Sequence, residues 1–259
     1  MVEKEMINQK KQKYTGTFRD YAQLIVEVML LVFFINTFLL QTYVIPTPSM
    51  ENSMLIGDHL LLDKVSYSPF INGVDRFFLP QVTIKRGMLM AFIGPNELNR
   101  NQRAKNVVKR AIALPGETIK IIDNKVFIDG KPIDEPYTRI KGVGGVANFP
   151  PEVPQAWHYE FPLKYRRSVV KTPLGKAFKV PEGHFFCMGD NRNVSFDSRY
   201  WGPLPANLIL GKPWRVYWSY ASTSSDYLNL GFVEKITDFF RTALNFFSRT
   251  RWERTFKKY

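Results

Sequence analysis

Cysteine is nearly absent from this sequence, and histidine is scarce. Cys187 is the one cysteine, so no internal disulfide can form, and an oxidising compartment would add no such support. The three histidines, His59, His158 and His184, are widely spaced. With a single thiol beside them, they do not offer the ligand set of a structural zinc site. We therefore expect no metal and no cofactor.

The chain also lacks a dense block of lysine and arginine, although it is strongly basic. Its formal net charge is +13, which indicates attraction to an anionic partner. Because the basic residues are spread out and no zinc-finger spacing is present, we expect a phospholipid surface as that partner, and no nucleic acid. Hydrophobic residues make up 45% and charged residues 23%, which argues against wholesale disorder.

One long apolar run stands near the start, at residues 24–40, with Glu27 and Asn36 as its polar interruptions. Residues 21–45 supply the roughly 20 residues that a membrane-crossing helix needs. Five basic residues lie within residues 1–20, and the next is Lys64, so the sequence predicts a cytoplasmic N-terminal segment and an exported body. Residues 41–46 contain no small-residue cleavage site, which favours a retained anchor in the inner membrane. The alternative is a buried core helix.

The body after residue 45 has the pattern of a mainly β, antiparallel fold. Apolar runs at 60–65, 88–93 and 185–188 indicate strands, and 119–128 with its Asp123-Asn124 turn indicates a hairpin. Between 138 and 179, glycines and prolines are frequent and periodicity is weak. We therefore predict a β-rich core from 46–137 and 180–222, with 138–179 as a small inserted lobe.

A proline-rich stretch follows the apolar run directly. It reads Ile45-Pro46-Thr47-Pro48-Ser49-Met50 and continues to Met54. The two prolines fix φ and remove N–H donors, which predicts an extended segment and excludes a helix. Such a segment could hold the Ser49 hydroxyl near a bilayer as a nucleophile, or it could be only a juxtamembrane linker.

Two charges interrupt a predicted strand at 107–114. Alternation places Lys109 on one face with Val107 and Ala111, and Arg110 on the other. A buried lysine loses its proton readily, and a neutral amine is what a general base needs. The alternative is an edge strand from which both side chains reach solvent.

A polar loop follows the predicted strand 185–188. Residues 189–202 read Gly-Asp-Asn-Arg-Asn-Val-Ser-Phe-Asp-Ser-Arg-Tyr-Trp-Gly. Many charged groups directly after a core strand predict a hydrogen-bonded loop held against the core. Taken alone, such a cluster is simply a turn.

With these three regions in place, the chain resembles the type I signal peptidases, which are membrane-anchored serine endopeptidases with a serine–lysine dyad. The motifs that carry the resemblance are Pro-x-x-Ser-Met, residues 109–116 and residues 189–199, in the family's order. The sequence departs from the family pattern at Pro48, Asn52, Met88 and Asn193-Val194. None of these departures removes a proposed catalytic group.

The resemblance implies a role for each site residue. Ser49 would be the nucleophile and Lys109 the general base, acting through an acyl-enzyme. Thr47 would help the Ser49 N–H bind the oxyanion, and Ser195 would orient the lysine amine. The supporting groups would be Asp190, Asp197 and Arg199, and the apolar candidates for the substrate pocket are Ile45, Met50, Met54, Val107 and Val108. The substrates would be exported preproteins with small residues before the cut; the oligomeric state stays open.

Two rival functions remain at this point. A Ser-His-Asp triad would use one of the three histidines, and activity would then survive loss of the lysine. A catalytically inactive, membrane-anchored β module that binds exported chains or anionic lipid would also explain the charge and the apolar run. It gives no reason for Lys109, Ser49 and Ser195 together.

The last part of the sequence, 223–259, is amphipathic and basic. Apolar residues recur at helical spacing at 232, 236, 239, 240, 243 and 247, followed by five basic residues. We predict a helix on an anionic lipid surface. The alternative is a helix packed on the β core.

Overall fold

The computed structural model describes residues 17–65, 83–94, 106–140, 144–223 and 232–259. Its contacts divide the chain into one unit that ends at Leu39 and a second that begins at Leu40. Most of the predicted cytoplasmic segment, residues 1–16, lies outside the described residues.

The first unit is helical. Helix α2, Phe18–Phe34, is followed by a π-helical turn η1, Ile35–Leu39. The Asp20 carboxylate accepts hydrogen bonds from the Thr17 N–H and hydroxyl, which satisfies a free donor at the helix start. Along α2 the apolar side chains are exposed. In the part of the chain that the structure describes, no helix meets both the length and the apolarity that crossing a membrane requires.

The helix predicted over residues 21–45 extends too far at its C-terminal end, because the helical residues end at Leu39. Residues 40–44 form strand β1, Leu40–Val44, which pairs with residues 59–63 of the second unit. Thr42, Tyr43 and Val44 are β-branched or aromatic and fit a pleated surface. Pairing to a neighbouring strand therefore takes precedence over continuing the helix.

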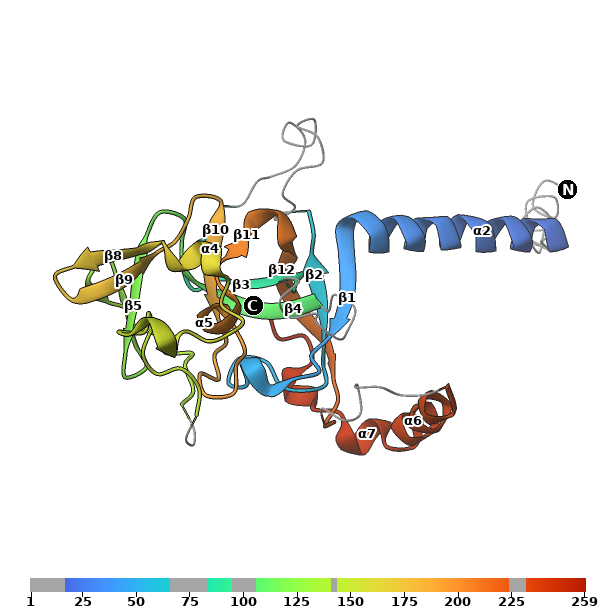
Figure 1. The fold of residues 1–259 in the computed structure, drawn as a ribbon. Coiled ribbons are helices and arrows are strands. Elements are labelled where there is room, and N and C mark those ends of the chain that lie inside the picture. The colour runs from blue at the N-terminus through green and yellow to red at the C-terminus, as the bar shows by residue number, and fades with distance from the viewer. Residues whose placement is uncertain (1–16, 66–82, 95–105, 141–143, 224–231) are drawn as a thin grey trace, which may run out of the picture. The chain divides into compact units, whose positions relative to one another are not determined.

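The second unit contains a seven-stranded antiparallel sheet in the order β1-β2-β12-β3-β4-β10-β11 (Figure 1). The remaining strands of this sheet are β2 Asp58–Asp63, β3 Leu89–Ile93, β4 Asn106–Ala113, β10 His184–Met188, β11 Leu204–Pro205 and β12 Ile209–Ser219. The strands predicted at 60–65, 88–93, 107–114 and 185–188 are thus confirmed within a few residues.

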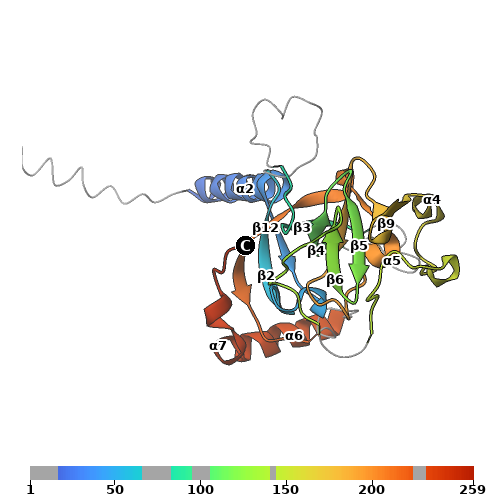
Figure 2. The ribbon, with the colours of Figure 1, turned by 90° about the vertical axis from the view of Figure 1, so that its left-hand side faces the viewer.

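A second antiparallel sheet has the order β7-β6-β5-β9-β8, and its strands β5, β6 and β9 are labelled in Figure 2. Its strands are β5 Thr118–Ile122, β6 Lys125–Ile128, β7 Lys131–Pro132, β8 Val169–Thr172 and β9 Gly175–Lys179. The predicted hairpin is confirmed, and Asp123 and Asn124 both take positive φ at its turn, as a two-residue hairpin favours. Because β9 pairs with β5, this sheet contains strands from both sides of the predicted boundary at 137/138. The inserted lobe stays a prediction.

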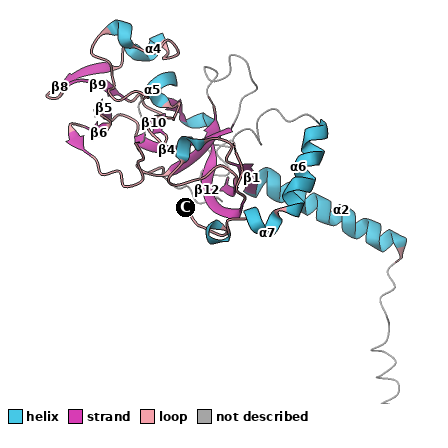
Figure 3. Cartoon of the chain, turned by 90° about the horizontal axis from the view of Figure 1, so that it is seen from below, coloured by secondary structure: helices cyan, strands magenta, loops and turns pink. Residues whose placement is uncertain are grey.

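Within the described residues, the helices of the second unit are short except for α6 (Figure 3). They are the 3-10 turns η2 Pro48–Met50, η4 Pro154–Ala156, η5 Ala206–Leu208 and η7 Trp252–Arg254, and the α-helices α4 Leu163–Arg166, α5 Ser198–Trp201, α6 Phe232–Leu244 and α7 Phe246–Arg249. The turn η2 corrects the expectation that the prolines exclude any helix. Pro48 occupies the first turn, where the missing N–H has no helical partner to lose.

Two hydrophobic clusters place the site. One contains residues of both sheets, including Ile112 and Phe186 with Ile119 and Phe178, so it fixes the sheets against each other. The other lies under the Ser49 segment and consists of Ile45, Met50, Met54, Leu60, Leu62, Leu89, Ala91, Val108 and Val216. The predicted mainly β, antiparallel class is confirmed, and the structure shows that its strands form two sheets.

Candidate active site

Ser49 lies in the middle of η2 and is 8% exposed. The turn closes on itself, because the N–H groups of Glu51 and Met54 donate to the carbonyls of Pro48 and Met50. The Thr47 hydroxyl lies 3.4 Å from the Ser49 Oγ and its side chain is exposed. The segment thus holds a buried Ser49 hydroxyl next to an exposed Thr47 side chain, on a backbone that is fixed by its own hydrogen bonds.

Lys109 comes from β4 and is 2% exposed. Its Nζ lies 2.5 Å from the Ser49 Oγ, although 60 residues separate the two in the chain. Burial lowers the pKa of Lys109 from 10.5 to about 8, despite the opposing charge of Asp197. An amine in this state can take a proton from the hydroxyl that it contacts at a pH close to neutral.

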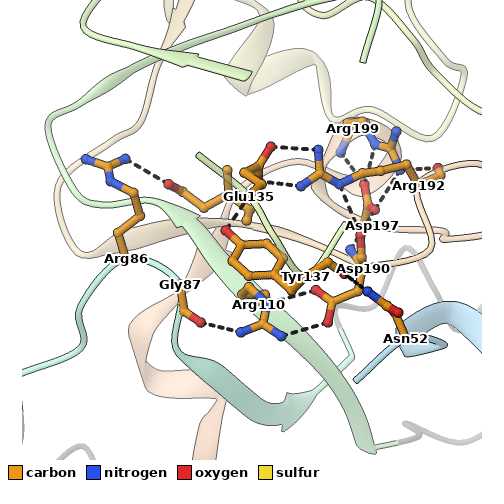
Figure 4. A network of polar contacts seen from close by, with 12 residues as sticks. Asn52, Arg86, Gly87, Arg110, Glu135, Tyr137, Asp190, Arg192, Asp197 and Arg199 are labelled. Atoms are coloured by element: carbon orange, nitrogen blue, oxygen red, sulfur yellow. Dashed lines mark hydrogen bonds and ion pairs between the residues drawn. The ribbon is translucent and has the colours of Figure 1, made fainter. Parts of the chain in front are cut away.

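The residue after Lys109 connects the strand to the 189–202 loop. Arg110 donates two hydrogen bonds to Asp190, at 2.8 and 2.7 Å, and a further one to the Gly87 carbonyl. Its guanidinium also lies over the Tyr137 ring, 3.9 Å from the centroid (Figure 4). The bidentate Arg110–Asp190 pair is almost excluded from solvent, and it fixes the position of the loop beside Lys109.

The loop is bonded to the main chain of the nucleophile itself. The Asn191 N–H donates to the Ser49 carbonyl at 3.1 Å, and the Asn191 side chain donates to the Pro48 carbonyl at 3.3 Å. The position of Ser49 is thereby tied to the loop and, through Asp190, to the strand that carries Lys109.

Asp197 and Arg199 form a second buried pair. Arg199 donates to both carboxylate oxygens, at 2.8 and 2.9 Å, and the Gly189 N–H donates to the same carboxylate. Burial alone would raise the pKa of Asp197, but the Arg199 charge and its hydrogen bonds lower it overall. Asp197 also caps α5, where it accepts the Arg199 N–H. It therefore stays ionised and fixes the far end of the loop.

A third pair was not singled out from the sequence. Arg192 is fully buried and binds Glu135 through its two terminal guanidinium nitrogens, and its Nε donates to the Gly189 carbonyl (Figure 4). Arg192 lies inside the 189–199 motif, and an arginine directly after a core strand indicates that an acidic partner is buried with it. Glu135 has no sequence signal, because its 57-residue separation from Arg192 appears only in the fold.

Ser195 is buried beside the dyad, at 3% exposure. Within the described residues its Oγ has no hydrogen-bond partner. It packs against Gly189, because a Cβ added there would meet the Ser195 Oγ at 2.2 Å and the Ser49 carbonyl oxygen at 2.5 Å. The role of Ser195 in orienting Lys109 stays a prediction.

The five pocket candidates fall into two groups. Ile45, Met50, Met54 and Val108 belong to the cluster under Ser49 and are at most 4% exposed. Val107 packs with a different cluster around Phe92 and Trp201. Four of the five candidates thus lie together in the hydrophobic core next to Ser49. Their role in a substrate pocket stays a prediction.

The histidines have other neighbours. His59 lies against Tyr217 and Trp218, His158 against Tyr159, Phe196 and Tyr200, and His184 against Tyr165. All three are within the described residues, and none of them makes a hydrogen bond to Ser49 there. The geometry does not favour a Ser-His-Asp triad.

A family model described as "Signal peptidase, peptidase S26" matches residues 18–218 of this chain. The chain belongs to the signal peptidase S26 family. Signal peptidases I are serine endopeptidases that cleave signal peptides from exported preproteins, and this is the activity of the chain. The inactive β module is thereby set aside.

Individual relatives agree with the family. The chain is 29% identical to the signal peptidase I of Pseudomonas aeruginosa over 78% of its own length and 72% of that protein. It is 32% identical to the probable signal peptidase I-1 of a Synechocystis strain, over 74% of its own length and 79% of that protein. A crystal structure of a signal peptidase I from Enterococcus faecalis covers 51% of this chain and 97% of its own, with 26% identity and a TM-score of 0.31.

Proposed function

We propose that Ser49 and Lys109 carry out this cleavage as nucleophile and general base. The observation that carries the proposal is the 2.5 Å distance between the Lys109 Nζ and the Ser49 Oγ, inside a site where the amine is buried. Neutral Lys109 takes the Ser49 proton while Oγ attacks the carbonyl before the scissile bond. The protonated amine then gives its proton to the leaving nitrogen, and an acyl-enzyme forms.

The second half of the reaction uses the same two groups. Lys109, neutral again after the first proton transfer, takes a proton from a water molecule that attacks the acyl carbon. The protonated amine then gives this proton to Ser49 Oγ as the bond to the acyl carbon breaks, which restores the free serine and the neutral lysine. In both steps the oxyanion is bound by the Ser49 N–H and the Thr47 hydroxyl, whose oxygen is 3.4 Å from the Ser49 Oγ. Asp190, Asp197 and Arg199 keep the surrounding loop in place through their ion pairs.

Substitution of the dyad tests this assignment. We expect Ser49→Ala and Lys109→Ala to lower the rate of preprotein cleavage by at least about 10³-fold, since each removes a group that acts in every step. Cleavage would be measured on a preprotein with the full chain reconstituted in lipid. His59→Gln and His184→Gln serve as controls and should retain activity. Normal cleavage by either dyad variant would refute the assignment.

A second proposal concerns membrane attachment through the helical unit. We propose that residues 21–39 of the unit formed by α2 and η1 attach the chain to the inner membrane, with 1–20 on the cytoplasmic side and residues from 40 onward on the other face. The exposed apolar side chains, such as Leu24, Met29 and Leu30, support this, since they are 55–66% exposed to solvent. The basic residues before Tyr21 support the orientation.

Two measurements test the attachment. The chain should stay with membranes through carbonate extraction, and protease added outside spheroplasts should degrade residues from 40 onward. Extraction of the intact chain by carbonate would contradict the anchor. Protection of the 40–259 unit from external protease would contradict the orientation.

The α6 helix supports a second lipid contact. Its apolar residues Ile236, Phe239, Phe240 and Leu244 are 45–86% exposed, so this face is not packed on the β core. We propose that it lies on anionic phospholipid, where basic residues nearby add to the attraction. Phe239→Ser with Phe240→Ser should weaken binding of the chain to vesicles with anionic lipid, measured in a variant without residues 1–39. Unchanged binding would contradict the contact.

A further inference from the structure

The last residues of the sequence lie outside the part that the family model matches, which ends at residue 218. We define residues 250–259 as the tail segment. It runs antiparallel to β12, because Tyr220 pairs with Thr250 and Arg215 with Lys258. Main-chain hydrogen bonds from Arg251, Val216 and Phe256 continue this pairing. The tail segment is therefore an additional element attached to the seven-stranded sheet.

The tail segment reaches the loop that carries Ser49. The Arg254 guanidinium and the Tyr259 hydroxyl both donate to the Ser53 carbonyl, at 3.1 and 2.6 Å. The Tyr259 ring packs against the cluster that includes Met50 and Met54. Burial and the negative charge of Asp58 raise the pKa of Tyr259 to about 12, so its hydroxyl remains a donor across the working pH range.

Asp58 anchors these contacts. It is fully buried at the start of β2 and binds Arg254 through both carboxylate oxygens, at 3.2 and 2.5 Å. It also accepts the Ser219 hydroxyl and the Leu55 N–H. Burial raises the pKa of Asp58, but the hydrogen bonds from Arg254 and Ser219 lower it overall. A charge-assisted, multiply bonded carboxylate of this kind holds Arg254 in one orientation.

Ser53 is also bound by the strand that carries the base. The Ser53 Oγ accepts from Arg110, whose other bonds go to Asp190 and Gly87. Ser53 therefore receives one donor from the strand of the base and two from the tail segment. Its N–H donates to the Met50 carbonyl, which couples it to the turn that contains Ser49.

We propose that the tail segment is a positioning element for the nucleophile, with Arg254 and Tyr259 setting the position of the 48–54 turn relative to Lys109. The inference rests on the proposed Ser49–Lys109 dyad. It concerns residues that touch neither substrate nor reacting atoms. Their effect is on the alignment of Ser49 with its base, and so on the rate of the chemical step.

Tyr259→Phe tests the proposal with the least disturbance, because it removes the hydroxyl and keeps the ring. Loss of one such hydrogen bond should lower kcat about 2- to 10-fold, with KM almost unchanged. The matched control is Lys258→Gln, which alters an exposed side chain in the same segment and should leave both parameters unchanged. Both are measured on the full chain in detergent with one preprotein substrate.

The pH profile separates positioning from a general loss of folded protein. If the turn moves away from Lys109, water reaches the amine, and its pKa moves from about 8 back toward 10.5. The pH at half-maximal kcat/KM should therefore rise in Tyr259→Phe and rise further in Arg254→Gln. A purely structural role would lower the amount of active enzyme and leave this midpoint where it is.

The outcomes for the tail segment and for the dyad can be told apart. If Ser49→Ala inactivates the enzyme, but Tyr259→Phe has the kcat and the pH midpoint of the parent chain, only the tail inference is wrong. If Ser49→Ala remains active, the dyad itself is wrong. Should Arg254→Gln fail to fold, Tyr259→Phe still decides the question.

Discussion

Asp190 accepts two hydrogen bonds from Arg110 side by side, and this pair joins the loop that holds Ser49 to the strand that presents Lys109. The two partners are 80 residues apart in the sequence. Its neighbours extend the connection, since the Asn191 N–H reaches the Ser49 carbonyl and Arg110 reaches the Ser53 hydroxyl. The dyad is thus aligned by an ion pair that takes no part in the proposed chemistry.

Removal of one partner should therefore be costly. Asp190→Asn leaves the Arg110 guanidinium buried without its counter-charge, and we expect the free energy of unfolding to fall by about 3 to 5 kcal/mol. Denaturant unfolding measures this. The matched control is Glu117→Gln, whose partner Arg86 is 30% exposed, and there the loss should stay within about 1 kcal/mol. Equal effects in the two variants would contradict the role of burial.

The pH dependence of cleavage should follow Lys109. Its pKa is lowered to about 8, and the neutral amine is the base, so activity should rise as the pH increases through 8 and then level off. Lys109→Arg should show no activity at any pH, because a guanidinium does not deprotonate in proteins. The kcat/KM profile of the parent chain provides the measurement. A rise centred near pH 6 to 7, the range of an ordinary histidine, would contradict the lysine base.

Gly189 has room for hydrogen alone. A Cβ at this position would stand 2.2 Å from the Ser195 Oγ and 2.5 Å from the Ser49 carbonyl oxygen. Gly189→Ala must therefore displace the nucleophile turn, and we expect cleavage to fall by at least about 10²-fold, as misplacement by about an ångström does. The control is Gly87→Ala. A Cβ added at Gly87 would have its nearest neighbouring atom 4.0 Å away, so the main penalty of this variant is the positive φ of the alanine. Retained activity in Gly189→Ala would show that the turn tolerates the shift.

The Thr47 hydroxyl is the remaining test of the oxyanion site. Thr47→Val keeps the shape and removes the donor, and we expect kcat to fall about 10²- to 10³-fold. Because the side chain is exposed, the melting temperature should hardly change. Thr47→Ser restores a hydroxyl and should recover most of the activity. Equal rates for the valine and serine variants would remove Thr47 from the mechanism.

Much of the fold was predictable from the sequence because its signals are local. The strands at 60–65, 88–93 and 185–188 and the Asp123-Asn124 hairpin depend on short apolar runs and turn residues, and all are confirmed. The errors occurred where tertiary pairing outweighs local pattern. Residues 40–44 read as helix from hydropathy, yet they join β2 as a strand, since the backbone groups of both strands are satisfied that way.

The candidate site shows the same contrast between local sequence patterns and tertiary contacts. The sequence by itself determined which residues are candidates, because a serine between prolines, a lysine inside an apolar strand and a charged loop after a core strand are visible as patterns. Only the tertiary structure decided how they meet, through pairs such as Arg192–Glu135 and Arg254–Asp58 that are 57 and 196 residues apart. No local pattern reports such contacts, because they arise when strands and loops distant in the chain pack into one low-dielectric interior, where each buried charge requires its partner.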